Sequence, residues 1–235
     1  MTTIAGNLQQ VQARIARACE ASSRPVSSVQ LLAVSKTFGP DAVRQAHAAG
    51  QLAFGENYVQ EGVDKIVAVA AQLPRELLQW HCIGPLQSNK TRPVAEHFDW
   101  VQSIDRLKIA QRLSEQRPTH LSALNVCLQV NIDGGANKSG VTPAELPALA
   151  DAVAALPRLR LRGLMCIPEP VPGFDAQRAL FAQARDLFAA LQARGHALDT
   201  LSMGMSEDLE AAIAAGATLV RVGRAVFGDR ALKTA

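Results

Sequence analysis

The sequence predicts an α/β protein built as a (β/α)8 barrel with an additional N-terminal helix. Eight short apolar runs, rich in β-branched residues, alternate with longer segments of helical periodicity, a pattern typical of buried parallel strands joined by helices. The length of 235 residues is near the roughly 250 usual for this barrel. The expected strands are Val29–Ser35, Leu52–Gly55, Gln79–Gly84, Trp100–Ser103, Leu124–Ile132, Leu161–Ile167, Thr200–Met203 and Thr218–Gly223.

An open, doubly wound sheet is the competing architecture. That fold needs fewer strands and usually has a glycine-rich turn after the first one. The first expected strand instead ends in Ser35-Lys36-Thr37, and no G-x-G-x-x-G motif follows it. The most loop-like stretch, Pro168–Gly173, comes directly after an expected strand, so it is interpreted as a strand-to-helix loop and not as a domain boundary. We therefore expect one barrel domain over residues 1–235.

The segment before the first strand, Ile4–Ala21, is expected to form an amphipathic helix. Its apolar residues lie along one stripe of a helix, so it should pack against the outside of the domain. Two other helices are expected to begin at Pro40-Asp41 and at Ser103–Asp105. The residues of the N-terminal stripe are Ile4, Leu8, Val11, Ile15 and Ala18.

Two further helices are expected from residues typical of helix ends. Thr142–Glu145 has the pattern of a capping box, with Pro143 at the first helical position. Ser206–Asp208 is expected to cap a helix that ends near Gly216.

Composition and charge restrict the classes of protein to which this chain can belong. Hydrophobic residues make up 48% of the chain, enough for a sizeable core, and Lys+Arg 24 against Asp+Glu 21 gives a formal net charge of only +3. Nucleic acid is therefore not expected as a partner, because such domains usually show clustered positive charge. No signal peptide is visible, and no apolar run approaches the ~20 residues that span a bilayer. We expect a soluble, cytoplasmic protein without a membrane partner.

The cysteines fit the same compartment. They are far apart in the sequence and form no CxxC pair, and most lie in apolar runs. Free thiols in the core of a protein from a reducing compartment are the expected interpretation. The four cysteines are Cys19, Cys82, Cys127 and Cys166.

Lys36 is the first candidate for chemistry, because reactive residues of a barrel collect where its strands end. It directly follows an expected strand, so its side chain would start inside the mouth of the barrel. Partial burial lowers the pKa of a lysine and favours the neutral amine, which is the form that condenses with an aldehyde to give an imine. From position alone, a lysine that extends to solvent or forms a salt bridge is the favoured interpretation.

Polar residues also follow the second and third expected strands. Glu56, Asn57 and Tyr58 could orient a ligand, although on position alone helix capping is the favoured role of Asn57. His81 lies within an apolar run and could face either the barrel interior or the surrounding helices. No second histidine lies at metal-ligand spacing, so no metal site is expected. Lys138, in a polar loop after the fifth strand, could approach the site or be solvated.

The ends of the last two expected strands have the features of an anion site. In barrels a phosphate commonly binds between the loops after strands seven and eight. Ser206 offers a hydroxyl, Gly223 allows close approach of the backbone, and Arg224 adds a cation. The alternative is that Ser206 caps a helix while the arginines point outward.

Taken together, these segments resemble the pyridoxal phosphate homeostasis proteins, single-barrel relatives of the N-terminal domain of bacterial alanine racemase. The similar segments occur in the same order from the first strand to the eighth and therefore cover nearly the whole chain. They are Ala33–Lys36, Phe54–Glu61, Trp80–Lys90, Lys138–Gly140, Arg162–Met165, Ser202–Ser206 and Arg221–Gly223.

The resemblance implies a fold type III binding site for pyridoxal 5′-phosphate (PLP), with Lys36 holding the cofactor as a Schiff base. It places the phosphate near Ser206, Gly223 and Arg224, Arg221 beside the pyridine nitrogen, and Asn57 near the ring. Position 224 is usually a small hydroxyl residue in this family, so Arg224 leaves the detail of phosphate binding open. The remaining residues assigned to the cofactor site are Ile83, Met165, Met203 and Met205.

The resemblance suggests a non-catalytic carrier that buffers PLP and delivers it to other enzymes through transient contacts with their apo forms. The alternative is an amino-acid racemase, which needs an acid/base group on each face of the substrate. In alanine racemase a tyrosine from a second domain serves one face, whereas this chain ends at Ala235 and has a single tyrosine, Tyr58. We therefore assign no catalytic residues, and we expect a monomer because the second domain builds the racemase dimer.

A third hypothesis is a metabolic barrel enzyme acting on a sugar phosphate, which the expected phosphate site alone would permit.

Overall fold

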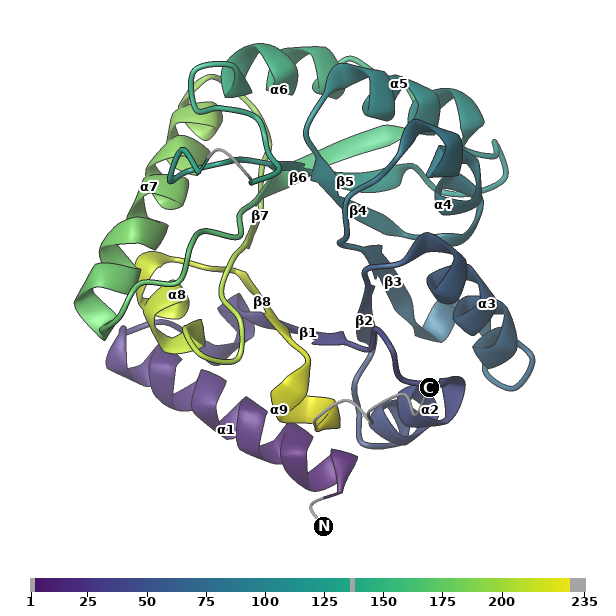
Figure 1. Cartoon of the computed structure of the whole chain (residues 1–235), viewed down its shortest axis with the longest axis horizontal. Helices are drawn as coiled ribbons and strands as arrows, with labels where there is room; N and C mark the ends of the chain where they lie inside the picture. Colours follow the sequence, from purple (N-terminus) through teal and green to yellow (C-terminus); the bar gives the residue numbers. More distant parts are fainter. Residues whose placement is uncertain (1–2, 136–137, 229–235) are drawn as a thin grey trace.

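The computed structural model describes residues 3–135 and 138–228, and its strands form one closed, parallel barrel in sequence order. Figure 1 looks down this barrel, with the helices as an outer ring. The sheet closes between the first and last strands, where Leu32 pairs with Arg221 and Ala33 with Val222. The strands are β1 (Gln30–Val34), β2 (Ala53–Glu56), β3 (Gln79–Cys82), β4 (Trp100–Ile104), β5 (Leu124–Gln129), β6 (Leu159–Met165), β7 (Thr200–Ser202) and β8 (Leu219–Val222).

All eight expected strands are confirmed, and the (β/α)8 barrel is the observed architecture. The largest difference is at β5, which ends at Gln129 although the apolar run continues to Ile132. Val130 makes only an isolated bridge to Val141, yet Val130 and Ile132 are buried. An apolar run shows which residues are buried and not which residues pair with a neighbouring strand. The apolar run therefore predicts a strand that is longer than β5.

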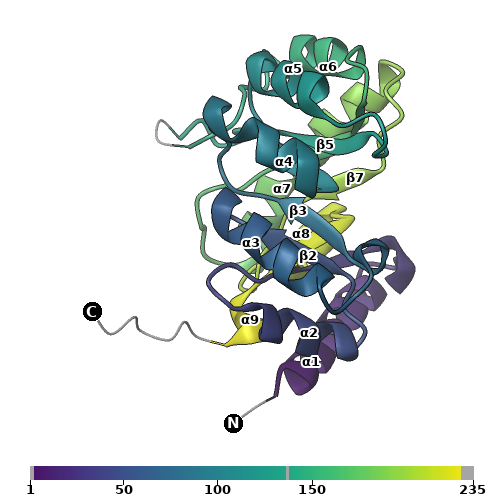
Figure 2. The same ribbon diagram turned by 90° about the vertical axis from the view of Figure 1, so that its right-hand side faces the viewer.

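The helices lie outside the barrel. The helices are α1 (Ile4–Ala21), α2 (Pro40–Ala48), α3 (Val59–Ala70), α4 (Thr91–His97), α5 (Leu107–Gln116), α6 (Leu146–Ala154), α7 (Phe174–Ala193), α8 (Leu209–Ala215) and α9 (Arg224–Phe227). A side view shows α5, α4, α3 and α2 one above another on the side of the barrel that faces the viewer (Figure 2). No helix in the described part of the chain is long and apolar enough to cross a membrane.

The core has two layers because successive residues of a strand face opposite sides of the sheet. In β1, Leu31 and Ala33 belong to the large cluster between strands and helices. Leu32 and Val34 belong instead to a small cluster inside the barrel. The alternation explains how a short strand can be buried on both faces and still direct selected side chains into the barrel.

The N-terminal helix α1 is confirmed with the expected bounds, and it packs outside the barrel against α2, α8 and α9. It also donates hydrogen bonds to α9 and to the loop after β7. Asn7 Nδ2 donates to Val226 O at 2.9 Å, and Arg14 Nη2 donates to Ser206 O at 2.9 Å. Arg14 is further paired with Glu210 at 2.8 Å. The additional helix therefore supports the segments that follow β7 and β8.

Three expected helix starts are wrong in detail. α5 begins at Leu107 and not at Ser103–Asp105, because Ser103 and Ile104 still belong to β4. α8 begins at Leu209, so Ser206 does not cap it, and the Asp208 carboxylate accepts from Met205 N–H at 2.6 Å. The reciprocal hydrogen bonds between Thr142 and Glu145 do form, but they lie in a turn before α6, so Pro143 is not helical. Local hydrogen-bonding motifs thus form where expected without fixing where the helix begins. The predicted end at Gly216 is confirmed by its left-handed backbone.

The four cysteines are buried and unpaired, as expected. Burial raises the pKa of the Cys82, Cys127 and Cys166 thiols to about 12. These thiols remain protonated at neutral pH and act as small apolar residues of the core.

Gly163 allows β6 and β7 to approach, and Gly163→Ala is expected to destabilise the barrel. An added Cβ atom would lie 1.7 Å from Thr200 O, so the two strands would have to separate. We expect a loss of about 3 kcal/mol or more in the free energy of unfolding, measured by urea denaturation. The control Gly39→Ala adds a methyl group with nothing within 4 Å and should change stability by less than about 1 kcal/mol. Equal effects of the two substitutions would contradict this account.

Candidate functional site

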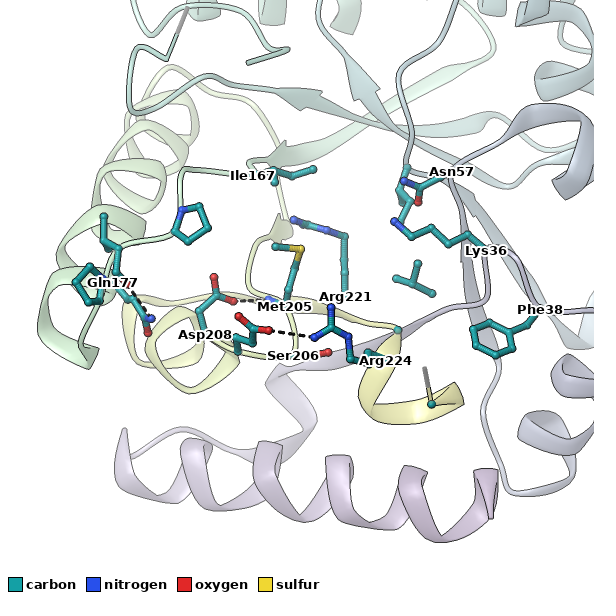
Figure 3. A pocket seen from close by; sticks show the side chains of 18 residues that line it. Lys36, Phe38, Asn57, Ile167, Gln177, Met205, Ser206, Asp208, Arg221 and Arg224 are labelled. Carbon is teal, nitrogen blue, oxygen red and sulfur yellow. Dashed lines mark hydrogen bonds and ion pairs between the residues drawn. The ribbon is translucent and has the colours of Figure 1, made fainter. Parts of the chain in front are cut away.

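A cavity of about 840 Å³ lies at the end of the barrel where the strands finish. Its walls come from residues at the ends of six of the strands and in the segments that follow them, which converge because parallel strands end at the same rim. Figure 3 shows these side chains at close range. Eight of the expected site residues line the cavity: Lys36, Asn57, Ile83, Met205, Ser206, Arg221, Gly223 and Arg224.

Lys36 lies in the turn directly after β1 and is half-buried. Figure 3 shows its side chain running into the cavity toward Asn57. Backbone hydrogen bonds fix the turn, since Ser35 N–H donates to Gly55 O at 3.0 Å and Phe38 N–H donates to Ser35 O at 3.0 Å. The amine therefore enters the cavity from a turn that is anchored to β2.

Arg221 is buried inside the barrel and begins a hydrogen-bonded chain across its interior. Its guanidinium donates to Ser202 Oγ at 2.8 Å and to Cys166 O at 2.9 Å. Ser202 Oγ donates in turn to Gln102 Oε1 at 2.6 Å, and Gln102 Nε2 lies 2.9 Å from His81 Nδ1. Because a guanidinium can only donate, it sets the direction of each bond and makes His81 Nδ1 an acceptor.

The far end of this chain is therefore a neutral histidine that carries its proton on Nε2, a tautomer assigned from the network. His81 faces the barrel interior, where its ring stacks on Trp100 with centroids 5.0 Å apart. Burial lowers the pKa of His81 to about 3. Among the described residues, no group of three or more His, Cys, Asp or Glu side chains could hold a metal ion.

The segments after β7 and β8 form the opposite wall of the cavity. At Gly223 an added Cβ atom would lie 3.2 Å from Val34 O, so the backbone here passes close to β1. Arg224 is the first residue of α9, and its Nη1 atom lies 3.4 Å from Glu207 Oε1. Both side chains are mostly exposed, at 71% and 83%, so this ion pair contributes little to stability.

Asn57 does not cap a helix, because Tyr58 occupies the position before α3. The Asn57 Oδ1 atom is buried and, within the described part of the chain, has no hydrogen-bond partner. A buried amide oxygen without a partner is costly, and a ligand hydroxyl or N–H in the cavity would satisfy it.

Two residues assigned to the site lie elsewhere. Met203 packs in the cluster between strands and helices, because it follows the inward-facing Ser202 and therefore points outward. Met165 lies inside the barrel with Trp100, beneath the Ile167 side chain that lines the cavity. Neither methionine lines the cavity, whereas Met205 is at its rim and 40% exposed.

Lys138 lies outside the cavity lining and links two loops. Its Nζ atom lies 3.1 Å from Glu169 Oε1, and the Glu169 N–H donates to Asp133 Oδ2 at 2.5 Å. The polar loop expected after β5 includes residues 136 and 137, which lie outside the described residues. The contacts of Lys138 thus join the loop after β5 to the loop after β6.

Comparison with known proteins assigns the chain to a family. Residues 6–231 match the family described as alanine racemase, N-terminal domain. The pyridoxal phosphate homeostasis protein of Pseudomonas aeruginosa is 62% identical over 230 residues, which cover 98% of this chain and 97% of the relative. This chain belongs to the pyridoxal phosphate homeostasis protein family. The Escherichia coli K12 member is 55% identical, with 98% of each chain covered.

Solved structures agree with this family assignment. The structure of PipY from Synechococcus elongatus with PLP bound has a TM-score of 0.81 at 41% identity, covering 96% of this chain and all of that one (100%). An unknown protein from Bifidobacterium adolescentis has a TM-score of 0.89 at 34% identity, covering 95% and 94%. Alanine racemase from Corynebacterium glutamicum, at 20% identity and a TM-score of 0.64, shares the fold over 96% of this chain and 63% of its own.

Sequence reasoning missed four polar residues that support the site: Glu61, Lys65, Gln102 and Ser202. Two of them had a visible signal. Lys65 lies on the buried stripe of α3 with Ile66 and Val69, and Gln102 lies in the middle of a fully buried strand. A polar residue at an apolar position of a periodic pattern is itself evidence for a buried partner.

The neutral state of His81 predicts a loss of stability in mild acid. Its pKa of about 3 in the folded protein lies below the 6.5 of an exposed histidine, so the unfolded state binds the proton more tightly between these values. The free energy of unfolding should therefore fall as the pH decreases below about 6.5. His81→Asn retains an acceptor for Gln102 and should flatten this dependence. Urea denaturation from pH 7.5 to 4.5 measures both slopes, and parallel slopes would refute the assignment.

Proposed function

We propose that this protein binds PLP through Lys36 and acts in intracellular PLP homeostasis, as a carrier that buffers the free aldehyde and delivers it to other enzymes. The observation that carries the proposal is the cavity in which the Lys36 amine, the buried Arg221 guanidinium and the loop at Gly223 and Arg224 meet. The names of the relatives and the PLP bound in PipY support it.

The side chains of the cavity fit the functional groups of this ligand. The ligand supplies an aldehyde, with which the Lys36 amine would condense to a Schiff base with loss of water. Ser206, the Gly223 backbone and Arg224 would receive the phosphate, which suits a site between the loops after β7 and β8. Ile83 and Asn57 would contact the ring, and the buried Oδ1 of Asn57 offers an acceptor.

Arg221 favours a carrier over a racemase. A guanidinium only donates hydrogen bonds and keeps its charge, so it would oppose protonation of a pyridine nitrogen beside it. An unprotonated ring withdraws electrons less well and stabilises a carbanion less. This side chain is well suited to retaining the ligand and poorly suited to activating a substrate on it.

The acid and base groups of the cavity point the same way. Among the described residues, no tyrosine, histidine or cysteine lines it, and the single tyrosine, Tyr58, is 57% exposed at the start of α3. Asp208 and Glu207 do line the cavity, but Figure 3 shows Asp208 on the far side of Met205 and Arg221 from Lys36. A second proton-transfer group facing Lys36 is the feature that a racemase would need.

We propose further that the protein works as a single-domain monomer in the cytoplasm, and that delivery involves transient contact with PLP-dependent apoenzymes. The half-buried position of Lys36 suits this role, because a carrier has to retain its ligand and also release it.

Lys36→Ala is expected to abolish covalent binding of PLP. The wild-type protein should develop the visible absorbance of an imine when titrated with PLP, and borohydride reduction should place the added mass on Lys36 by peptide mass spectrometry. The control Lys108→Ala changes an exposed lysine of α5 and should retain both signals.

A wild-type protein that stays colourless with PLP, and whose lysine 36 is not modified by reduction, would refute the binding site. Robust conversion of L-alanine to D-alanine by the wild-type protein would instead refute the carrier assignment and favour the racemase.

Arg224→Ala is expected to weaken binding of PLP about 10-fold, because a hydrogen bond to a charged group is lost. Pyridoxal, which lacks the phosphate, should bind both proteins equally. Glu207→Gln removes the carboxylate that competes for Arg224 and should not weaken PLP binding. Fluorescence titration with both aldehydes measures these affinities, and an equal loss for both would place Arg224 away from the phosphate.

A further inference from the structure

We infer that Glu61 and Lys65 of α3 are positioning residues that fix the turn carrying Lys36 and so direct its amine into the cavity. The inference rests on the proposed role of Lys36 as the site of covalent attachment. Neither residue lines the cavity, and both act through the peptide groups on either side of Lys36.

The peptide group before Lys36 is held by a buried ion pair. Lys65 Nζ donates to Ser35 O at 2.7 Å and lies 2.6 Å from Glu56 Oε1. Ser35 Oγ donates to the same carboxylate oxygen at 2.5 Å. The side chains of Lys65 and Glu56 are 3% and 0% exposed, so these bonds do not exchange readily with water. The end of β1 is thereby joined to β2 and α3 through one ammonium group.

The peptide group after Lys36 is held by the second carboxylate. Glu61 Oε1 accepts from Thr37 N–H at 2.5 Å and lies 3.2 Å from Lys65 Nζ. Thr37 has a φ of 69°, in the left-handed region that a β-branched residue adopts only when the surroundings enforce it. The hydrogen bond from Thr37 N–H to the Glu61 carboxylate holds this conformation, so the strained turn depends on Glu61.

Stability alone does not explain a lysine at position 65. Burying an ion pair often contributes no more than apolar residues of the same size would, whereas a fixed geometry is a well-supported use of buried polar groups. The neighbouring positions of the stripe, Ile66 and Val69, are apolar, and Gly62 allows α3 to approach Glu56 closely. The polar group thus occurs at the one position of this stripe that reaches the backbone beside Lys36.

Glu61→Ala tests the inference, because the Glu61 side chain is 33% exposed and its loss leaves no deeply buried charge without a partner. The affinity for PLP, measured by visible titration, should fall about 10-fold, as for other residues that orient a binding group. The affinity for inorganic phosphate, measured by competition, should be unchanged, because Glu61 holds the turn after β1 and does not line the cavity.

Glu61→Gln keeps an acceptor for Thr37 N–H and should restore PLP binding to near the wild-type value. Asp64→Ala, on the exposed face of the same helix, should bind PLP like the wild type. Glu56→Gln combined with Lys65→Met removes the buried ion pair and leaves only the Glu61 carboxylate, which is 33% exposed and still accepts from Thr37 N–H, without its cation. This double variant should weaken PLP binding like Glu61→Ala. Urea denaturation of every variant reports whether the fold is intact.

Two results would overturn the inference: wild-type PLP affinity in folded Glu61→Ala, or a parallel loss of phosphate affinity, which would show general damage. Reductive methylation of the apo-protein distinguishes failure of the positioning role from failure of the proposed function. If no imine forms on wild-type Lys36, the proposed function fails. The rate of Lys36 methylation relative to Lys108 must still change in Glu61→Ala and return in Glu61→Gln, and an unchanged rate would then overturn the positioning role.

Discussion

Pairing between β1 and β8 is the constraint on which the site depends. Lys36 and Arg221 lie near opposite ends of the chain, and they share one cavity because Leu32 pairs with Arg221 and Ala33 with Val222. Closure also removes the two exposed edges that an open parallel sheet would have. All strands then end at the same rim, so short loops from six of them supply the lining of one cavity.

Three separate sets of polar contacts support the three parts of this cavity. Residues of α3 hold the turn of Lys36, the chain through Ser202 and Gln102 holds Arg221, and α1 donates hydrogen bonds to the loop after β7 and to α9. Each set lies behind the lining side chains and does not itself face the ligand. A site supported in this way is organised before binding, which reduces the ordering cost that a flexible site would have on association.

Inside the barrel, a chain of hydrogen bonds connects the charged guanidinium of Arg221 to the neutral imidazole of His81. The guanidinium of Arg221 imposes donor direction on Ser202 and Gln102, and burial keeps His81 uncharged at the far end. A second positive charge inside the barrel would face the first across a medium of low dielectric constant. Because burial leaves His81 uncharged, the Arg221 guanidinium does not face a second cation from this histidine inside the barrel.

The sequence by itself determined the elements and the rim residues of this protein. Periodicity located eight strands and α1, and position at a strand end identified Lys36, because both signals depend on residues that are close in the chain. Contacts between distant segments were decided only by the tertiary structure. Met203 and Met165 lie outside the cavity lining, and Lys65 meets the backbone beside Lys36. Which side chain reaches which partner follows from strand register and helix placement, and no local pattern in the sequence encodes these.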